Sequence, residues 1–295
     1  MNSKLKPSEL VLTEDGRIYH LGLHPWQLGD IVITVGDPKR VERVSRHFDK
    51  LELTNQKREF ITHTGMLGDK RISVIGTGIG PDNIDIMLNE IDALKNIDFE
   101  KREIKPEFQK LYIIRLGTSG ALRQEIAVDS IVAASYGLGL DGLLNFYDYE
   151  KQPYQEQFEN SLFKVVPEIK ELTIPYVFKG SQYLLDNVAG NFTHGITLTA
   201  GGFYGPQGRQ LRLKQKSKPV IDRLKNFEYK EYHITNFEME TAAIYGLAKL
   251  LGHEALSVNA IIANRINKTF SKDPYQTIDK MIALALEKIE TLELH

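Results

Sequence analysis

Hydrophobic residues along this 295-residue chain follow two patterns, which indicate two kinds of element. Short unbroken runs rich in Val and Ile end at a glycine or a polar residue and predict buried strands. Apolar residues that recur every three or four positions predict amphipathic helices. We predict strands at residues 31–35, 71–75, 111–115, 130–135, 193–199 and 256–263, and helices that begin at Pro38 or cover residues 83–94, 240–251 and 277–292. This alternation predicts an α/β protein with a mostly parallel or mixed sheet.

No segment of the chain resembles a linker between domains. Residues 96–110 form a charged connection before a predicted core strand, and residues 152–173 form a polar segment with helical character. We therefore expect a single domain over residues 1–295, with residues 1–15 flexible.

The amino-acid composition excludes several kinds of partner and of functional site. The 37 basic and 39 acidic residues give a net charge of −2, which provides no bulk attraction to nucleic acid or to an anionic membrane. The chain has no cysteine, which excludes disulfides, thiolate nucleophiles and cysteine-ligated zinc. Residues 1–12 lack the apolar stretch of a secretory signal, and no apolar run approaches the roughly 20 residues of a membrane span. We expect a cytoplasmic protein with neither nucleic acid nor membrane as a partner.

Two segments suggest an anion site. Residues 36–40 follow a strand and open a helix, where Gly36 permits close approach of the backbone and Arg40 adds a forked donor. Residues 115–120 place Arg115 at the end of an apolar strand and two hydroxyls between glycines, which suits an oxyanion. Each segment has a plainer explanation: a surface arginine after an ordinary turn for the first, and an arginine paired with a core carboxylate for the second.

Residues 238–240 place two carboxylates around Met239 at the start of a predicted helix. Carboxylates accept hydrogen bonds from vicinal hydroxyls and a thioether packs on an apolar sugar face, so this segment suits a ribose. The alternative is a solvated acidic helix start that favours the helix dipole. The glycines at 76, 78 and 80 do not form the dinucleotide-binding pattern, because Pro81 occupies the next position.

These segments, with residues 203–209 and 261–265, together resemble the nucleoside phosphorylases, and within them the uridine phosphorylases. The resemblance runs from about His20 to Arg265. It implies a three-layer α/β/α fold with a central mixed, partly barrel-like sheet. It also implies phosphorolysis of uridine, and of deoxyuridine or thymidine, to the free base and (deoxy)ribose 1-phosphate in pyrimidine salvage. Inorganic phosphate is then the co-substrate, with no metal and no other cofactor.

The resemblance assigns roles to individual positions. The phosphate-binding positions are Gly36, Arg40, Arg58, Arg115 and Thr118. The ribose-binding positions are His20, Thr118, Met239 and Glu240. The base-binding positions are Ser119, Gly120, Phe203, Gln207, Arg209 and Ile262. The positions that assist catalysis are Arg115, Gln207, Arg209 and Arg265. Uracil presents two carbonyl oxygens with an N–H between them. An amide can donate to and accept from these groups, and a guanidinium can donate to a carbonyl oxygen.

In the resembled family, the positions of Arg58 and His20 reach the phosphate and the ribose of a neighbouring subunit. The resemblance therefore implies self-association, at least as a dimer, and the bacterial relatives are commonly hexamers. Some of those relatives place a monovalent cation between subunits near the positions of Glu59 and Ile79. This chain has Pro81 and its two successors where those proteins have Gly-Pro-Ser, which argues against a potassium site.

Residues 264–265 bear on the choice of base. Purine phosphorylases and the nucleosidases that hydrolyse methylthioadenosine carry Ser-Asp at this place, where the acid assists a purine leaving group. Asn264 and Arg265 supply no acid there, and Arg265 can instead stabilise negative charge on a departing uracil or brace the strand end. A phosphorylase with another base preference, a nucleosidase that uses water and a non-catalytic nucleoside-binding protein remain as alternatives.

Overall fold

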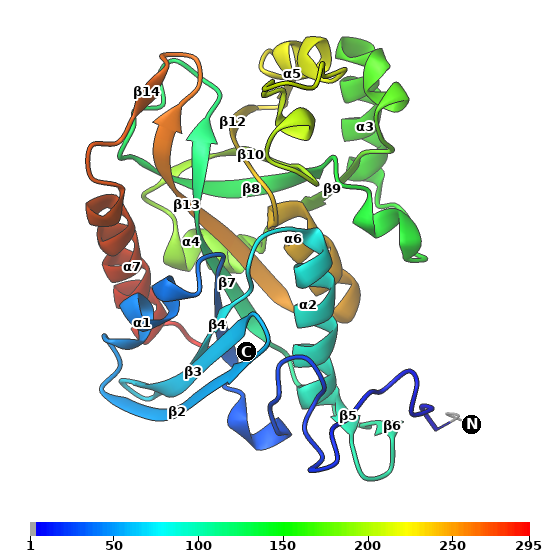
Figure 1. Cartoon of the computed structure of the whole chain (residues 1–295), viewed down its shortest axis with the longest axis vertical. Coiled ribbons are helices and arrows are strands. Elements are labelled where there is room, and N and C mark those ends of the chain that lie inside the picture. Colours follow the sequence, from blue (N-terminus) through cyan, green and yellow to red (C-terminus); the bar gives the residue numbers. More distant parts are fainter. Residues whose placement is uncertain (1–3) are drawn as a thin grey trace.

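The computed structural model describes residues 4–295 as an α/β protein with one large twisted sheet (Figure 1). Within these residues the sheet has twelve strands, and a separate two-stranded hairpin lies beside it. The strands are β1 (Ile31–Val35), β2 (Lys50–Lys57), β3 (Phe60–Leu67), β4 (Lys70–Gly76), β5 (Ile97–Asp98), β6 (Glu103–Ile104), β7 (Tyr112–Ala121), β8 (Ile131–Gly139), β9 (Tyr176–Lys179), β10 (Thr193–Thr199), β11 (Glu228–Tyr229), β12 (Tyr232–Glu238), β13 (Glu254–Asn264) and β14 (Thr269–Phe270). β5 and β6 form the hairpin.

Five strands close into a ring. The sheet runs β12-β10-β8-β13-β7, and β12 also pairs with β7, so the path returns to its start. The pairs β12–β7 and β13–β8 are antiparallel, whereas β10 is parallel to both of its neighbours and β13 is parallel to β7. The central sheet is therefore mixed and barrel-like, as the resemblance implied. The closing contact pairs Asn236 with Ala121 and Phe237 with Gly120.

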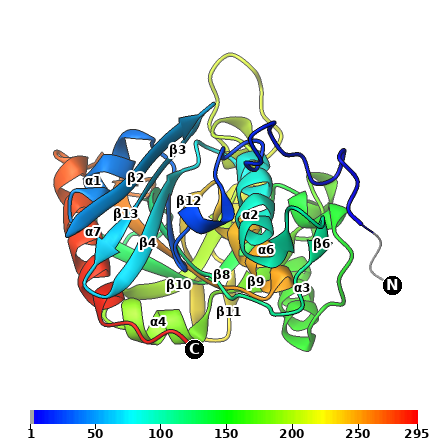
Figure 2. The ribbon, with the colours of Figure 1, turned by 90° about the horizontal axis from the view of Figure 1, so that it is seen from below.

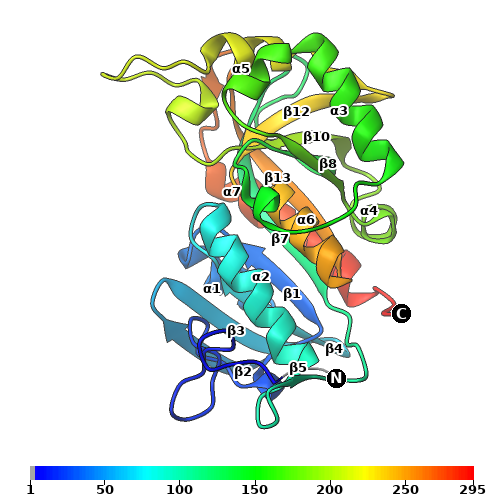
Figure 3. The same ribbon diagram turned by 90° about the vertical axis from the view of Figure 1, so that its right-hand side faces the viewer.

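The rest of the sheet extends from β7 as an open wing. β1 lies between β7 and β4 and is parallel to both, and all five of its residues are buried. β4, β3 and β2 continue outward as an antiparallel meander. In Figure 3 this wing occupies the lower half of the molecule and the ring the upper half, with β7 running between them.

Helices cover both faces of the sheet. The helices are α1 (Lys39–Ser45), α2 (Pro81–Asn96), α3 (Pro153–Val165), α4 (Gln182–Val188), α5 (Lys218–Leu224), α6 (Thr241–Leu251) and α7 (Pro274–Glu290), with short 3₁₀ turns at η1 (Pro25–Gln27), η2 (Leu143–Phe146), η3 (Pro167–Glu171) and η4 (Gly205–Gln207). Side chains of α1, α4 and α7 share one apolar cluster with β1, β4, β7 and β13, and those of α2 and α6 share another on the opposite side. Figures 1 and 2 show the two groups flanking the sheet, which gives the expected three layers.

The predicted elements correspond closely to the structure, but two strands were predicted too short, since the strand predicted at 130–135 also continues, as β8, to Gly139. The strands predicted at 31–35 and 193–199 match β1 and β10, and Gly252 ends α6 in a left-handed conformation. The end of the strand predicted at 111–115 is wrong, because β7 continues to Ala121. The backbone from Gly117 to Gly120 pairs with β13 and β12 and completes the ring.

The N-terminal segment contacts the body of the protein. Leu10 is buried in the cluster that contains α2 and α6, and the Leu5 N–H donates to the carbonyl of Arg102. The expected flexibility of residues 1–15 stays a prediction, and it falls in part on residues 1–3, which lie outside the described residues. No helix within residues 4–295 is long and apolar enough to cross a membrane.

Candidate active site

A cavity of about 640 Å³ opens where the wing meets the ring. Its walls come from the turn after β1, the second half of β7, the end of β13, the start of α6 and the loop before η4. Predicted site residues that line it are Gly36, Arg40, Arg115, Thr118, Ser119, Gly120, Phe203, Gln207, Arg209, Met239, Glu240 and Ile262. The fold thus brings together, from five separate segments, most of the site residues that were predicted from the sequence.

One end of the cavity holds two buried arginines. Arg40 lies in the first turn of α1, and its Nη1 donates to the carbonyl of Leu116 at 3.2 Å. Burial, together with the charge of Arg115, lowers the pKa of Arg40 to about 10. Each of these positive charges makes burial of the other less favourable. An anion placed between them would therefore be stabilised. This end of the cavity is therefore suited to an oxyanion such as phosphate.

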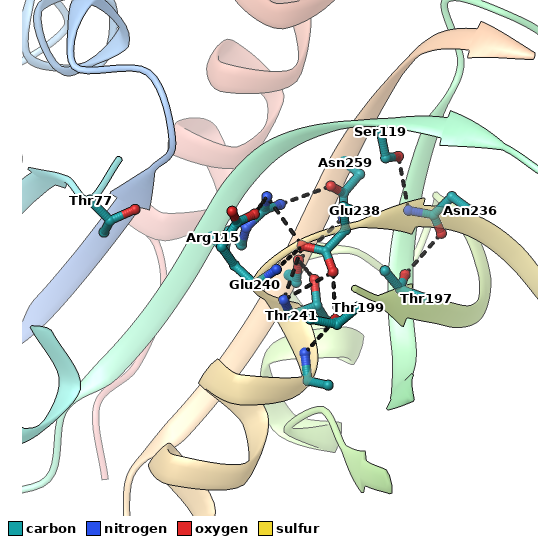
Figure 4. Close-up of polar contacts among 12 residues, drawn as sticks. Thr77, Arg115, Ser119, Thr197, Thr199, Asn236, Glu238, Glu240, Thr241 and Asn259 are labelled. Carbon is teal, nitrogen blue, oxygen red and sulfur yellow. Dashed lines mark hydrogen bonds and ion pairs between the residues drawn. The ribbon is translucent and has the colours of Figure 1, made fainter. Parts of the chain in front are cut away.

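Arg115 is held by a buried polar network (Figure 4). Its Nη2 lies 2.5 Å from Glu240 Oε2 and 3.2 Å from Glu238 Oε2, and its Nη1 donates to Asn259 Oδ1 at 2.8 Å. Burial alone would lower the pKa of Arg115, but the two carboxylates raise it above its ordinary value. The plainer explanation, an arginine paired with core carboxylates, is thus correct, and the same arginine also lines the cavity.

The two carboxylates around Met239 have different tasks. Glu238 caps α6: its oxygens accept from the backbone N–H groups of Glu240 and Thr241 at 2.9 to 3.1 Å and from Thr199 Oγ1 at 2.6 Å. Burial raises the pKa of Glu238, and Arg115 opposes that rise. Glu240 accepts from the Gly80 N–H at 2.8 Å. The glycine turn after β4 therefore positions Glu240, whose carboxylate borders the cavity beside Met239.

The other end of the cavity combines an aromatic ring, an amide and a guanidinium. Arg209 lies over the ring of Phe203, with Cζ 3.8 Å from the centroid, and donates to Gln207 Oε1 at 2.5 Å. Gln207 is buried. Burial, then the charge of nearby Arg265, lowers the pKa of Arg209 to about 10. This end presents several donors beside an apolar surface, which suits a flat heterocycle with carbonyl oxygens.

Arg265 lies directly behind this end without lining the cavity. Its Nη2 donates to the carbonyl of Gln207 at 2.6 Å, and its Nη1 is buried without a hydrogen-bond partner among residues 4–295. Burial lowers its pKa. Asn264 points elsewhere: its amide donates to the carbonyls of Arg123 and Ile126 and accepts from two backbone N–H groups. Asn264 is therefore a structural residue that ties two loops together.

His20 and Arg58 lie outside the cavity but close to each other. The Arg58 guanidinium donates to the Tyr19 hydroxyl at 3.2 Å and lies 5.2 Å from its ring centroid, and the Tyr19 and His20 rings meet edge to face at 4.9 Å. Glu90 accepts from the His20 backbone N–H at 2.9 Å and lies 2.6 Å from its Nδ1. One chain therefore assembles these two residues into a separate group, the Tyr19 group, which also includes Glu90.

Comparison with known proteins identifies the family. A model of the phosphorylase superfamily matches residues 30–292. The chain belongs to the phosphorylase superfamily. A uridine phosphorylase of Thermococcus kodakarensis is 28% identical over 275 residues, covering 92% of this phosphorylase and 86% of that protein. A DeoD-type purine nucleoside phosphorylase of Buchnera aphidicola is 26% identical over 274 residues, covering 92% and 98%.

The fold of this phosphorylase has a solved counterpart. The crystal structure of a Trypanosoma brucei nucleoside phosphorylase, which shows uridine phosphorylase activity, has a TM-score of 0.84 and 27% identity. The match covers 95% of this chain and 98% of that one. The relatives thus agree on the fold and on the nucleoside phosphorylase class, and they divide between pyrimidine and purine bases.

Sequence reasoning missed several residues that line the phosphorylase cavity. These are Asp37, Pro38, Gly78, Ile79, Phe237, Ala263 and Phe270. Gly78 and Ile79 could have been found, because β4 is parallel to β1 and parallel strands end at the same edge. Phe270 could not have been found, because it reaches the cavity through the pairing of β14 with β13, and no local sequence pattern predicts that pairing.

Proposed function

We propose that this chain catalyses the reversible phosphorolysis of uridine, and of its 2′-deoxy analogues, to uracil and (deoxy)ribose 1-phosphate. The observation that carries the proposal is the base end of the cavity. Gln207 and Arg209 converge there next to the Phe203 ring, so an amide and a guanidinium meet one edge of a flat base. Uracil offers two carbonyls with an N–H between them, which an amide that both donates and accepts can match.

The proposed mechanism needs no protein nucleophile. Arg40, Arg115 and Thr118 hold phosphate under the sugar, so that its oxygen attacks the anomeric carbon as the bond to the base breaks. Met239 and Glu240 fix the ribose, which converts a bimolecular attack into an effectively unimolecular one. Arg209 and Arg265, with Gln207, stabilise the negative charge that develops on the leaving uracil. Inorganic phosphate is the co-substrate.

The first test is chromatography of uridine incubated with the purified protein, with and without inorganic phosphate. Uracil and ribose 1-phosphate should appear only with phosphate. Uracil without phosphate would indicate a nucleosidase instead. Absence of turnover, with thymidine and inosine also inert, would refute the enzyme and leave a nucleoside-binding protein.

A matched pair of arginine variants tests the base end. Arg209→Ala should reduce kcat/KM for uridine roughly 10²-fold or more, as for the loss of other donors to a developing anion. Arg212→Ala is the control, because Arg212 lies three residues along the same loop, is exposed and does not line this cavity. Equal effects of the two substitutions would contradict the assignment of Arg209 to the base.

A purine nucleoside is the second candidate, because curated relatives of similar identity are purine phosphorylases. Two residues argue against it. The Asn264 amide is already hydrogen-bonded to backbone carbonyls, so it is not available to a base. Arg265 supplies a guanidinium at the place where protonation of a purine needs an acid. Uridine and inosine assayed side by side decide the question: a kcat/KM that favours inosine would reverse the assignment.

We also propose that the Tyr19 group completes the cavity of a second subunit, with Arg58 on the phosphate and His20 on the ribose. Arg58→Ala and Arg209→Ala, each of low activity, can be unfolded, mixed and refolded. If Arg58 acts across an interface, mixed dimers contain one intact site, and random pairing restores about a quarter of wild-type activity. No recovery would mean that Arg58 serves its own chain, and full activity of Arg58→Ala by itself would mean that Arg58 has no role.

A further inference from the structure

Closure of the ring places Asn236 beside Ser119. β12 meets β7 at this point, with Asn236 paired to Ala121 and Phe237 to Gly120. The two side chains are 117 residues apart in sequence, yet Asn236 Nδ2 donates to Ser119 Oγ at 2.9 Å (Figure 4). Ser119 lines the cavity, whereas Asn236 is fully buried behind it. Asn236 can therefore reach a ligand only through Ser119.

The orientation of the Asn236 amide is fixed from its other side. Its Oδ1 accepts from Thr197 Oγ1 at 2.9 Å and from Thr235 Oγ1 at 2.8 Å. Thr235 has a second acceptor in the carbonyl of Ile196 at 3.2 Å, but Thr197 is fully buried and Oδ1 is the one acceptor for its hydroxyl among residues 4–295. Turning the amide over would leave the Thr197 proton unsatisfied, which folded proteins avoid. The N–H therefore points to Ser119.

This arrangement decides what Ser119 can offer. Its oxygen already accepts a hydrogen bond from the Asn236 amide, so the Ser119 hydroxyl must donate its own hydrogen to another acceptor. No acceptor for that hydrogen lies within hydrogen-bond distance in the described part of the chain, and the cavity is the open side. A buried chain of hydroxyl, amide and hydroxyl thus ends at Ser119, whose hydroxyl hydrogen is left to donate towards the cavity.

We propose that Asn236 is a positioning residue that makes Ser119 an obligatory hydrogen-bond donor to a carbonyl oxygen of the leaving base. The proposal rests on the proposed function. Ser119 is placed at the base end because β7 runs from Arg115, at the phosphate end, towards Gly120, whose backbone lies close to Arg265 behind the base end. The carbonyl oxygen gains negative charge as the glycosidic bond breaks, so the bond from Ser119 strengthens in the transition state.

Ser119→Ala and Ser119→Thr form the primary test. Calorimetric titration with uracil and, separately, with inorganic phosphate distinguishes the two ends of the cavity. Ser119→Ala should weaken uracil binding and lower kcat/KM for uridine about 10-fold or more, as expected for a bond to a partly charged acceptor. Ser119→Thr keeps the hydroxyl and should stay near wild type. Phosphate affinity should not change in either variant.

Asn236→Asp tests the positioning role. A carboxylate at this place can only accept, so the Ser119 proton would turn away from the ligand and uracil affinity should fall as far as in Ser119→Ala. In the Ser119→Ala background, the same substitution should cost no further uracil affinity. Should Asn236→Asp not fold, Asn236→Ala replaces it, because it releases the Ser119 hydroxyl, and the same non-additivity is expected.

Three results would overturn the inference. Uracil affinity unchanged in Ser119→Ala removes the donor role. A loss confined to phosphate assigns the proton to the other end of the cavity. Additive losses in the double variant show that Asn236 does not act through Ser119. Wild-type protein that binds no uracil would instead refute the proposed function and this inference together, so the two failures are distinguishable.

Discussion

Gly117 is the residue whose substitution should disturb the site most for the smallest chemical change. A Cβ atom added at Gly117 would lie 1.6 Å from Arg115 Nη1, 2.4 Å from Arg115 Cζ and 2.8 Å from Asn259 Oδ1. Real Cβ atoms do not approach other atoms so closely, and the guanidinium folds back over this glycine to reach its partners. Gly117→Ala must therefore displace the Arg115 guanidinium.

The expected loss of stability follows from the two buried carboxylates that a displaced Arg115 would leave unpaired. Glu238 and Glu240 are both buried and both pair with this guanidinium, at 3.2 and 2.5 Å. Loss of one partner from a buried ion pair costs about 3–5 kcal/mol, because a charge remains uncompensated. We expect Gly117→Ala to lower the free energy of unfolding by about 3 kcal/mol and the melting temperature by roughly 6 °C. The KM for phosphate should rise together with this loss.

Gly120→Ala is the matched control for stability. It lies in the same strand and lines the same cavity, but an added Cβ would lie 3.5 Å from Arg265 Cγ, which is ordinary contact. Calorimetric melting of both variants should show a large shift for Gly117→Ala and a small one for Gly120→Ala. A Gly117→Ala protein that melts within 1 °C of wild type, with unchanged phosphate KM, would refute the reasoning about Arg115.

Three further variants probe residues away from the reacting groups. Burial raises the pKa of Asp141 above the ordinary 3.8 despite hydrogen bonds from Tyr176 and a backbone N–H, so the folded state keeps a proton that the unfolded chain has released. The free energy of unfolding therefore falls as pH rises from about 4 through the folded pKa, and Asp141→Asn should gain stability relative to wild type over that range in urea titrations. Asn264→Ala leaves two carbonyls and two N–H groups without partners and should cost about 3 kcal/mol in urea unfolding, with no gain of inosine turnover. Gly252→Ala forces a side chain into a left-handed conformation (φ 87°) at the end of α6 and should cost about 1 kcal/mol, with kcat and KM for uridine unchanged.

Local patterns predicted the interior of the fold well. β1 is a run of five β-branched residues, all of them buried, and the predicted helix at 83–94 lies inside α2. The strand β2, which was not predicted, has only exposed or half-buried residues and lies at an edge of the sheet, whereas β12, also not predicted, is mostly buried and belongs to the ring. The pairing of β2 is set by β3 rather than by the hydrophobicity of β2 itself, so its sequence carries little pattern to detect.

The site was predicted in its residues but not in its connections. Arg115 was selected as an anion ligand or as a partner of a core carboxylate, and the structure gives it both environments. What sequence cannot provide is the closure of β12 on β7, because it depends on the twist of the whole ring. That closure brings Asn236 to Ser119, and the turn after β4 brings Gly80 to Glu240, over 117 and 160 residues.

The order of charges along the cavity gives the strongest physical argument for the proposed reaction. Arg40 and Arg115 occupy one end and Arg209, backed by Arg265, the other, and the Glu240 carboxylate, which pairs with Arg115, also lines the cavity. In phosphorolysis the transition state carries negative charge on the phosphate, positive charge on the sugar ring and negative charge on the departing base. The cavity supplies a charge of opposite sign for each of these three groups, and such complementarity to a transition state lowers a barrier rather than only binding a substrate. Water as nucleophile would leave the Arg40 and Arg115 end without an anion to stabilise, so the charge order favours phosphate over water.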